Sequence, residues 1–239
     1  MDDADYIQVR SLGVQFYVLR DRTPDKRGLY LIDCGFINGL RGQHSLYKAI
    51  QKAGWEKEKI LGILVTHGHL DHVLNVAKLA EAKGAWIYAP RLDLAHYKGA
   101  ANYTGWAKIT GLLESLGKPL LGFKPFTPDR LLDDGDEIEI WHGLRTIHLP
   151  GHTRGHCGFY CEKLQLLFSA DLFASYQNFT HLPSEFFNDN SREIPTSIEK
   201  ALALDLKGVL PNHGDCASPA VHLKRLKKLF ETLRKGSLY

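Results

Sequence analysis

The run THGHLDH at residues 66–72 constrains this chain more than any other feature. It places three histidines and one aspartate within six residues, directly after the apolar segment Ile60–Val65. That segment is short and rich in branched side chains, so it predicts a buried strand. The following residues, Val73–Ala80, carry apolar side chains at helical spacing and predict a helix. The histidine-rich run therefore occupies a turn between a strand and a helix.

Side chains on such a turn can point in different directions. We predict that His67 and His69 face one metal ion, while Asp71 and His72 face a second ion. Imidazole and carboxylate ligands together suit zinc, iron or manganese. The alternative is an exposed histidine-rich loop without a metal. Further histidines and carboxylates at the ends of later strands argue against that alternative.

Three more ligand candidates follow apolar segments in the second half of the chain. His152 comes after the predicted strand 144–149, and His213 follows the apolar residues 208–210. We predict that His152 completes the first metal site and that His213 completes the second. Asp171 stands just past a buried strand, where an unpaired carboxylate is costly unless it meets a cation. We therefore expect Asp171 to bridge the two ions.

The remaining pattern alternates strands and helices, which indicates an α/β fold in one domain over residues 1–239. Residues 93–128 mix Gly, Pro, Tyr and Trp with short helical pieces, so we expect a surface insertion there. Residues 221–235 predict a C-terminal amphipathic helix that docks on the sheet. Strands are predicted at residues 6–10, 14–19, 29–33, 60–65, 85–89, 137–141, 144–149, 158–161 and 166–169, and helices at 45–53 and 72–80.

Composition gives no reason to expect a strongly charged partner. The net charge is +3, from 30 basic and 27 acidic residues, so nothing requires nucleic acid or an anionic membrane. No apolar run is long enough to cross a bilayer. The start MDDAD is acidic, unlike a secretory signal, and the four cysteines are scattered, so we expect a cytoplasmic protein. Its expected partner is a small-molecule substrate, and it is expected to be a monomer or homodimer.

The ordered motifs LIDCG, THGHLDH, PGHT, SAD and PNHGD together resemble those of the metallo-β-lactamase superfamily. The resemblance covers nearly the whole chain and implies a four-layer αβ/βα sandwich with metals at one edge, between the sheets. It also implies that Asp33, in LIDCG, supports the histidine-rich loop without doing chemistry. The cofactors implied are two divalent metal ions, zinc first, with iron or manganese open. The seven implied ligands are His67, His69 and His152 for one metal, Asp71, His72 and His213 for the other, and Asp171 between them.

Such a centre implies a hydrolase. Two close cations can share a water and lower its pKa, so that a metal-bridging hydroxide attacks a carbonyl or phosphoryl group. We assign Asp71 as the catalytic residue among the ligands. The first expectation is cleavage of a carboxylic thioester or of a lactone or other ester. Alternatives are a phosphodiesterase of the same fold, a mononuclear iron enzyme that resembles persulfide dioxygenases, and a binding protein that kept the fold without catalysis.

Departures from individual subfamilies narrow the substrate. The segment SADLF resembles glyoxalase II, but only a short tail follows His213, so we do not expect the glutathione-binding helical domain. Lactonases place a tyrosine where this chain has Ala174, and the nearest tyrosine is Tyr176. β-Lactamases have Cys or Ser at the position of Asp171, and flavodiiron proteins have Glu at that of His69. Nucleases of this superfamily carry an added domain or a basic arm, which we do not expect in a single-domain chain of net charge +3. The nuclease, β-lactamase and flavodiiron functions are therefore not expected.

The segment 173–195 leaves the predicted site and is rich in aromatic residues. It can form an apolar wall for a substrate, or its rings can simply pack the loop onto the domain. We name Phe173, Tyr176 and His181 as candidate substrate contacts.

Overall fold

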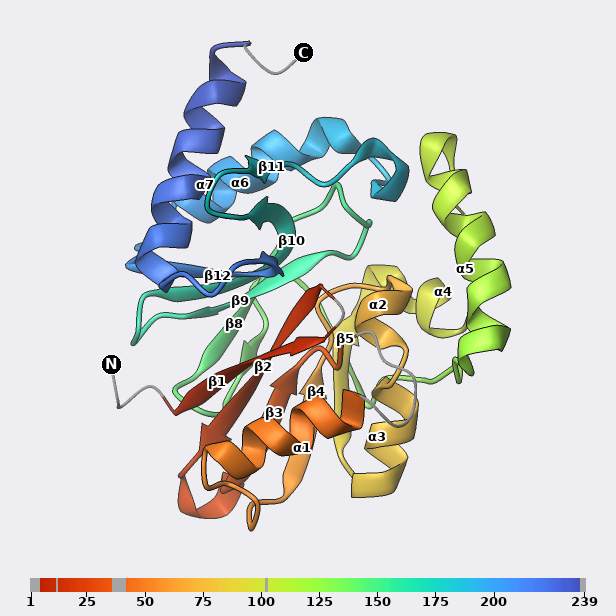
Figure 1. Cartoon of the computed structure of the whole chain (residues 1–239), viewed down its shortest axis with the longest axis vertical. Coiled ribbons are helices and arrows are strands. Elements are labelled where there is room, and N and C mark those ends of the chain that lie inside the picture. The colour runs from red at the N-terminus through yellow and green to blue at the C-terminus, as the bar shows by residue number, and fades with distance from the viewer. Residues whose placement is uncertain (1–4, 12, 36–41, 102, 237–239) are drawn as a thin grey trace.

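Two six-stranded β-sheets lie face to face and carry helices on their outer faces (Figure 1). The computed structural model describes residues 5–11, 13–35, 42–101 and 103–236. Three clusters of buried apolar side chains fill the spaces between successive layers. This arrangement confirms the four-layer αβ/βα sandwich predicted from the sequence.

The first sheet takes its six strands in sequence order. Its first three strands form the antiparallel meander that the sequence predicts, and the next three add in parallel. The strands are β1 (Tyr6–Ser11), β2 (Val14–Asp21), β3 (Gly28–Ile32), β4 (Ile60–Leu64), β5 (Trp86–Pro90) and β6 (Arg130–Leu132).

The second sheet has the order β11-β10-β9-β8-β7, and β12 pairs with β10 in parallel. The other pairs in this sheet are antiparallel. The strands are β7 (Glu137–Ile138), β8 (Leu144–His148), β9 (Cys157–Cys161), β10 (Leu166–Ser175), β11 (Thr180–His181) and β12 (Gly208–Gly214).

Helices α1 and α3 cover the first sheet, and α6 and α7 cover the second. None of the described helices is both long and apolar enough to cross a membrane. The α-helices are α1 (Gly42–Lys52), α2 (Leu70–Val73), α3 (Val76–Lys83), α4 (Leu94–Tyr97), α5 (Lys108–Leu121), α6 (Ile194–Leu202) and α7 (Pro219–Arg234). Short 3-10 turns are η1 (Pro24–Lys26), η2 (Arg91–Asp93), η3 (Gly105–Ala107), η4 (Glu185–Phe187) and η5 (Ser191–Glu193).

Strand β2 shows why the central strands are apolar on both faces. Phe16 and Val18 point into the cluster under the helices, whereas Tyr17 and Leu19 point into the cluster between the sheets. Successive side chains of a strand alternate between faces, so a strand in an inner layer must be apolar throughout. The continuous apolar runs of the sequence follow from this burial.

The chain around the histidine-rich run differs from the prediction. We expected one helix from His72 to residue 80, but α2 already begins at Leu70, and the helical segment is interrupted before α3. The interruption falls at Leu74 and Asn75, and the Asn75 side chain donates to the carbonyl of Gly35 at 3.3 Å. Asparagine has a low preference for a helix interior, and here its amide bonds to a distant segment of the chain. Asp71 and His72 therefore lie within a short helix.

Two strand predictions also need correction. Strand β10 runs on to Ser175, so Asp171 lies within the strand and not after it; pairing with β11 and β12 prolongs β10. The predicted strand 137–141 shrinks to two residues. Trp141 has a φ of 58°, and its N–H bonds to the carboxylate of Asp21, so the chain turns there.

The two segments singled out at the surface are helical. Residues 93–128 contain α4 and α5, and most apolar side chains of α5 are exposed. The predicted helix 221–235 corresponds to α7, and its residues Leu223 and Leu226 pack into the outer cluster of the second sheet.

Phe168 tests the packing between the sheets. It is fully buried, and its ring centroid lies 5.1 Å from that of Tyr17 and 5.8 Å from that of Trp141. We expect Phe168→Ala to lower the free energy of unfolding by about 3–5 kcal/mol, because it removes buried contacts and leaves a cavity. Urea unfolding measures this loss. The control Phe179→Ala removes a ring that is 65% exposed and should cost less than about 1 kcal/mol; equal losses would contradict the assigned core.

Candidate metal centre

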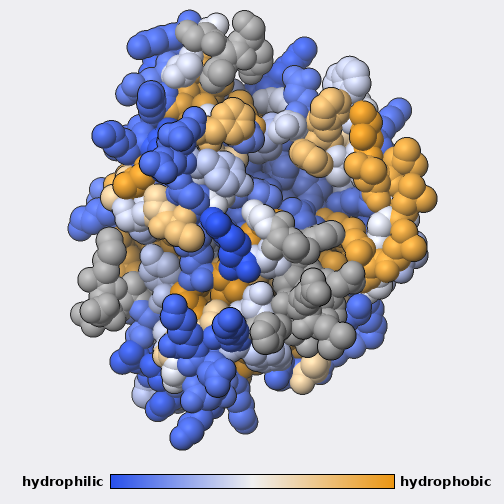
Figure 2. Space-filling model, viewed as in Figure 1, coloured by the Kyte–Doolittle hydropathy of each residue, from blue (hydrophilic) through white to orange (hydrophobic). Residues whose placement is uncertain are grey.

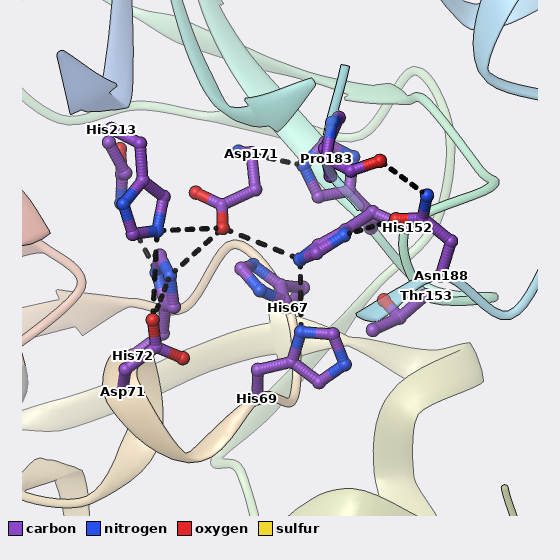
Figure 3. A network of polar contacts seen from close by, with 12 residues as sticks. His67, His69, Asp71, His72, His152, Thr153, Asp171, Pro183, Asn188 and His213 are labelled. Carbon is purple, nitrogen blue, oxygen red and sulfur yellow. Dashed lines mark hydrogen bonds and ion pairs between the residues drawn. The ribbon is translucent and has the colours of Figure 1, made fainter. Parts of the chain in front are cut away.

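The structure brings together all seven of the predicted ligands in two adjacent groups (Figure 3). Within each group, one potential ligand atom from every residue lies within 4.8 Å of the others. The residues come from the turn after β4, from α2, from the loop after β8, and from β10 and β12. The first group is His67, His69 and His152, and the second is Asp71, His72, Asp171 and His213.

Asp171 lies between the two groups. Its Oδ2 is 3.4 Å from Nε2 of His152 in the first group. The same oxygen is 3.5 Å from Nε2 of His72 and 3.1 Å from Nε2 of His213 in the second group. One carboxylate oxygen thus faces histidine nitrogens on both sides. This is the position that the sequence predicts for a bridging carboxylate.

The backbone around Asp171 is built to aim this carboxylate. Ala170 has a φ of 48°, and the pairing of β10 with β12 shifts register at this point. His156 fixes the next peptide, because its Nε2 accepts the N–H of Asp171 at 3.1 Å while its Nδ1 donates to the carbonyl of Leu149 at 2.7 Å. Burial lowers the pKa of His156 to about 3, so the ring is neutral and can accept. His156 is not among the site residues predicted from the sequence.

Asp33 organises the histidine-rich turn from beneath. Its fully buried carboxylate accepts the N–H of Thr66 at 2.8 Å and the Thr66 hydroxyl at 2.7 Å. It also lies 2.9 Å from Nδ1 of His72 and accepts from Asn212 at 2.6 Å. With the proton on Nδ1, the lone pair of His72 is on Nε2, which faces the second group. Asp33 therefore occupies the supporting position that the resemblance implies.

The other histidines are oriented in the same way. Because the Thr66 hydroxyl donates to Asp33, its oxygen is left to accept from Nδ1 of His67 at 3.0 Å. Nδ1 of His152 lies 2.8 Å from Oδ1 of Asn188, whose amide group donates to the carbonyl of Pro183 at 2.9 Å. Both rings then present Nε2 to the site. No spacing in the sequence connects Asn188 with His152.

Asp93 is a further residue that sequence reasoning missed. This fully buried carboxylate accepts the N–H of Gly68 at 2.8 Å, the hydroxyl of Thr153 at 2.6 Å and the N–H of Gly155 at 2.7 Å. It therefore ties the loop of the first two histidines to the loop of His152. The sequence feature that could have identified Asp93 is its position just after β5, which lies beside β4. Its position inside the expected surface insertion concealed it.

Several ligand atoms have no partner that would explain their burial. Among the described residues, Nε2 of His67, Nε2 of His72 and Oδ1 of Asp171 are buried and make no hydrogen bond. Nδ1 of His69 lies 2.9 Å from Nε2 of His152. Because Nδ1 of His152 faces the oxygen of Asn188, the lone pair of His152 is on Nε2 and points at His69. Burial, then the neighbouring histidine charges, hold the pKa of His67 and of His69 well below the usual range. Buried nitrogen and carboxylate oxygen atoms that converge in this way fit divalent cations.

A cavity of about 510 Å³ opens from the candidate centre. The three candidate substrate contacts, Phe173, Tyr176 and His181, all line it. Asp71, Asp171 and His213 are reached at its inner end, and residues of α5 form much of the rest of the wall. The candidate centre is thus open to a substrate, unlike a closed structural metal site.

The family follows from the comparison with known proteins. A family model described as the metallo-beta-lactamase superfamily matches residues 10–211. The chain belongs to this superfamily. The match includes six of the seven predicted ligands and ends two residues before His213. This is a superfamily of metallohydrolases, and its members bind divalent metals.

Curated relatives match only part of this metallo-beta-lactamase superfamily chain. An uncharacterized protein of Aquifex aeolicus (strain VF5) is 34% identical over 115 residues, or 48% of this chain and 49% of the relative. A hydroxyacylglutathione hydrolase of Chelativorans sp. (strain BNC1) is 30% identical over 134 residues, or 55% of this chain and 40% of the relative. The chain therefore spans less than half of the length of these two relatives.

Solved structures match over nearly the whole chain. A metallo-beta-lactamase family protein, TTHA1429 from Thermus thermophilus, has a TM-score of 0.71 at 17% identity, covering 97% of this chain and 80% of that one. This likeness concerns the fold alone. The protein TTHA1623 in a di-iron-bound form has a TM-score of 0.65 at 26% identity, covering 92% of this chain and 96% of that one.

Asp33 provides a test of how the ligands are held. We expect Asp33→Asn to weaken metal binding by about 10–100-fold, because the amide loses acceptor capacity toward His72 and Thr66. Competition with a chromophoric chelator measures the dissociation constants. Asp25→Asn, on the exposed turn η1, is the matched control and should bind metal like the wild type. Unchanged affinity in Asp33→Asn would show that the buried network does not support the ligands.

The metal-free protein should lose stability at alkaline pH. The charge of Asp171 raises the pKa of His213 from 6.5 to about 10. Because the folded state holds this proton more tightly than the unfolded chain, the stabilisation is complete below pH 6.5 and is lost as the pH rises toward 10. We expect a loss on the order of 3 kcal/mol in urea unfolding of the chelator-treated protein.

The variant His213→Gln should weaken this dependence between pH 6.5 and 10, since it removes one of the two histidines of this group whose pKa is raised above 6.5, the other being His72. His148→Gln, at the end of β8 and outside both ligand groups, should keep the wild-type slope. An equal slope in all three proteins would rule out a specific contribution from the Asp171–His213 pair.

Proposed function

We propose that this chain is a binuclear metallohydrolase that cleaves a carboxylic thioester or a lactone. The observation that carries the proposal is the position of Asp171, whose Oδ2 lies 3.1–3.5 Å from histidines of both groups. A carboxylate shared in this way is the arrangement of a two-metal site. Zinc is our first choice of metal, and iron and manganese suit the same ligands.

The two groups divide the work of holding the ions. His67, His69 and His152 would hold one ion, and the second would lie among Asp71, His72 and His213, with Asp171 shared. Bound there, two divalent cations supply a more acidic shared water and polarise the substrate carbonyl. The reaction adds water across the acyl bond: a thioester loses its carbon–sulfur bond and gives an acid and a thiol, whereas a lactone loses its ring carbon–oxygen bond and opens to a single hydroxy acid.

The protein side chains contribute orientation and charge. Asp33 and Asn188 hold the tautomers of His72 and His152, so their Nε2 atoms face inward. Burial opposes the ionisation of Asp171, but the charges of His213 and His72 outweigh it and hold its pKa well below the usual range. Asp71 is the more exposed of the two site carboxylates, at 34% against 7%, and lines the cavity. It can therefore accept a proton or hydrogen bond from a water and pass the proton to the leaving group.

Two observations favour acyl chemistry over the alternatives. The matched relative from Chelativorans sp. is named a hydroxyacylglutathione hydrolase, which cleaves a thioester. The second ligand group is complete, and a mononuclear iron enzyme has no need of it. All four cysteines are free, which supports a reducing compartment, and we place the enzyme in the cytoplasm with a small-molecule substrate.

A panel of thioesters and lactones tests the proposal. Protein loaded with zinc, manganese or iron should hydrolyse at least one of these classes, and Asp71→Asn should lower kcat/KM at least about a hundredfold, because it removes a ligand of the second group. Release of free thiol or of acid measures the rate. Asp133→Asn, a surface residue paired with Arg91, is the matched control and should retain the rate.

If the protein hydrolyses no thioester and no lactone with any of the three metals, the proposed acyl hydrolase is overturned. Oxygen consumption with a persulfide by the iron-loaded protein would then favour the mononuclear alternative. Hydrolysis of a phosphodiester in place of the acyl substrates would favour the phosphodiesterase.

A further inference from the structure

The cavity beside the metal centre has two chemically different ends. Its inner end carries the polar ligands Asp71, Asp171 and His213. Its outer wall is formed by apolar residues of α5, by Phe173 of β10 and by Phe187 of η4. This outer set is Leu113, Gly117, Leu121, Phe173 and Phe187, with Leu70 beneath it.

Helix α5 is the main element of the outer wall, and it is oriented in an unusual way. Its buried residues are the polar Thr110 and Glu114, while Leu113 is 60% and Leu120 is 84% exposed. Figure 2 shows apolar side chains gathered at the edge of the molecule where α5 lies in Figure 1. Leu113 belongs both to this exposed face and to the cavity.

The two polar side chains with which α5 lines the cavity, Thr110 and Glu114, are already hydrogen-bonded. Glu114 accepts the N–H of Leu70 at 2.9 Å and the hydroxyl of Tyr103 at 2.7 Å, and it pairs with Lys118 at 2.9 Å. The hydroxyl of Thr110 donates to the carbonyl of Phe186. Among the described residues that line the cavity, none is a lysine or an arginine. The α5 side of the cavity therefore offers contact to apolar groups and no lysine or arginine to an anion, while Tyr176, His181 and Ser184 line the cavity elsewhere.

We infer that the outer end of the cavity binds the neutral acyl chain of the substrate. This inference rests on the proposed function and names its substrate class: the carbonyl lies at the Asp171 end, and the chain extends along α5. A glutathione carrier brings carboxylates, and burying a carboxylate without a cation is costly. A methylene chain gains free energy from each carbon that leaves water. The substrate inferred here thus differs from the hydroxyacylglutathione that the name of the Chelativorans relative suggests.

Gly117 gives direct access to this end of the cavity. A Cβ placed on Gly117 would lie 3.5 Å from Cδ2 of Leu70 and 3.8 Å from Cδ1 of Leu121, which is ordinary contact. The helix therefore tolerates a side chain at this position, and replacing glycine favours the helix. A large side chain on Gly117 would occupy the space assigned to the acyl chain.

Chain length is the first measurement. We expect kcat/KM for thioesters of neutral N-acetylcysteamine to rise about fourfold per methylene from acetyl upward, until the chain fills the cavity. A hydroxyacylglutathione should be a poorer substrate than the octanoyl ester. A flat series, or a preference for the glutathione ester, would overturn the inference while leaving the hydrolase proposal intact.

The variant Gly117→Phe tests where the acyl chain of the substrate binds. The ratio of kcat/KM for octanoyl to acetyl ester should fall at least about tenfold, whereas Ser115→Phe, on the exposed side of the same helix, should keep the wild-type ratio. Leu113→Ser is a second variant, which removes an apolar contact without narrowing the cavity. It should also lower the ratio of kcat/KM for octanoyl to acetyl ester. An unchanged ratio in both cavity variants, with native circular dichroism, would show that the chain binds elsewhere.

Binding without turnover separates the two proposals. Calorimetry of the metal-free protein with octanamide, which is neutral, should show saturable binding that Gly117→Phe weakens at least about tenfold and Ser115→Phe leaves unchanged. S-methylglutathione should not compete. If no ester is hydrolysed but octanamide binds in this way, the hydrolase proposal fails and the acyl site stands. If octanamide does not bind, the acyl site fails whatever the turnover.

Discussion

The buried carboxylate of Asp33 is the interaction on which the rest of this site depends. It receives hydrogen bonds from the turn after β4 and from β12, and it meets His72 of α2. An ionised carboxylate without exposure is stable only when such partners surround it. Those partners come from both sheets, so they meet only when the sandwich is assembled. Folding and the orientation of the candidate ligands are therefore one event.

The same site concentrates backbone strain. Asp33 has a φ of 59° and Ala170 a φ of 48°, both in the left-handed region that most side chains avoid. Each such residue costs on the order of 1–3 kcal/mol and persists only where the surroundings determine it. Here Asp33 is fixed by its hydrogen bonds, and Ala170 by the shifted pairing of β10 with β12. The strain aims two carboxylates that regular strands would direct elsewhere.

The sequence predicted which candidate ligands lie close together, because each of them follows an apolar run of the chain. It could not predict the supporting residues. Asp93, His156 and Asn188 act through contacts between distant segments, such as the 2.8 Å contact of Asn188 with His152, and no local spacing records them. The end of β10 was misplaced for the same reason, since pairing with β11 and β12 carries the strand past Asp171.

Helix α5 links the wall of the cavity to the candidate metal centre. Its polar inner face docks through Glu114, which accepts the N–H of Leu70, the residue directly after His69. Tyr103, bonded to the same carboxylate, stacks at 6.3 Å from the ring of His69. One carboxylate thus sets both the place of the apolar wall and the surroundings of a candidate ligand. Changes on the outward leucines would alter what the wall contacts, whereas changes at Glu114 would reach the metal centre itself.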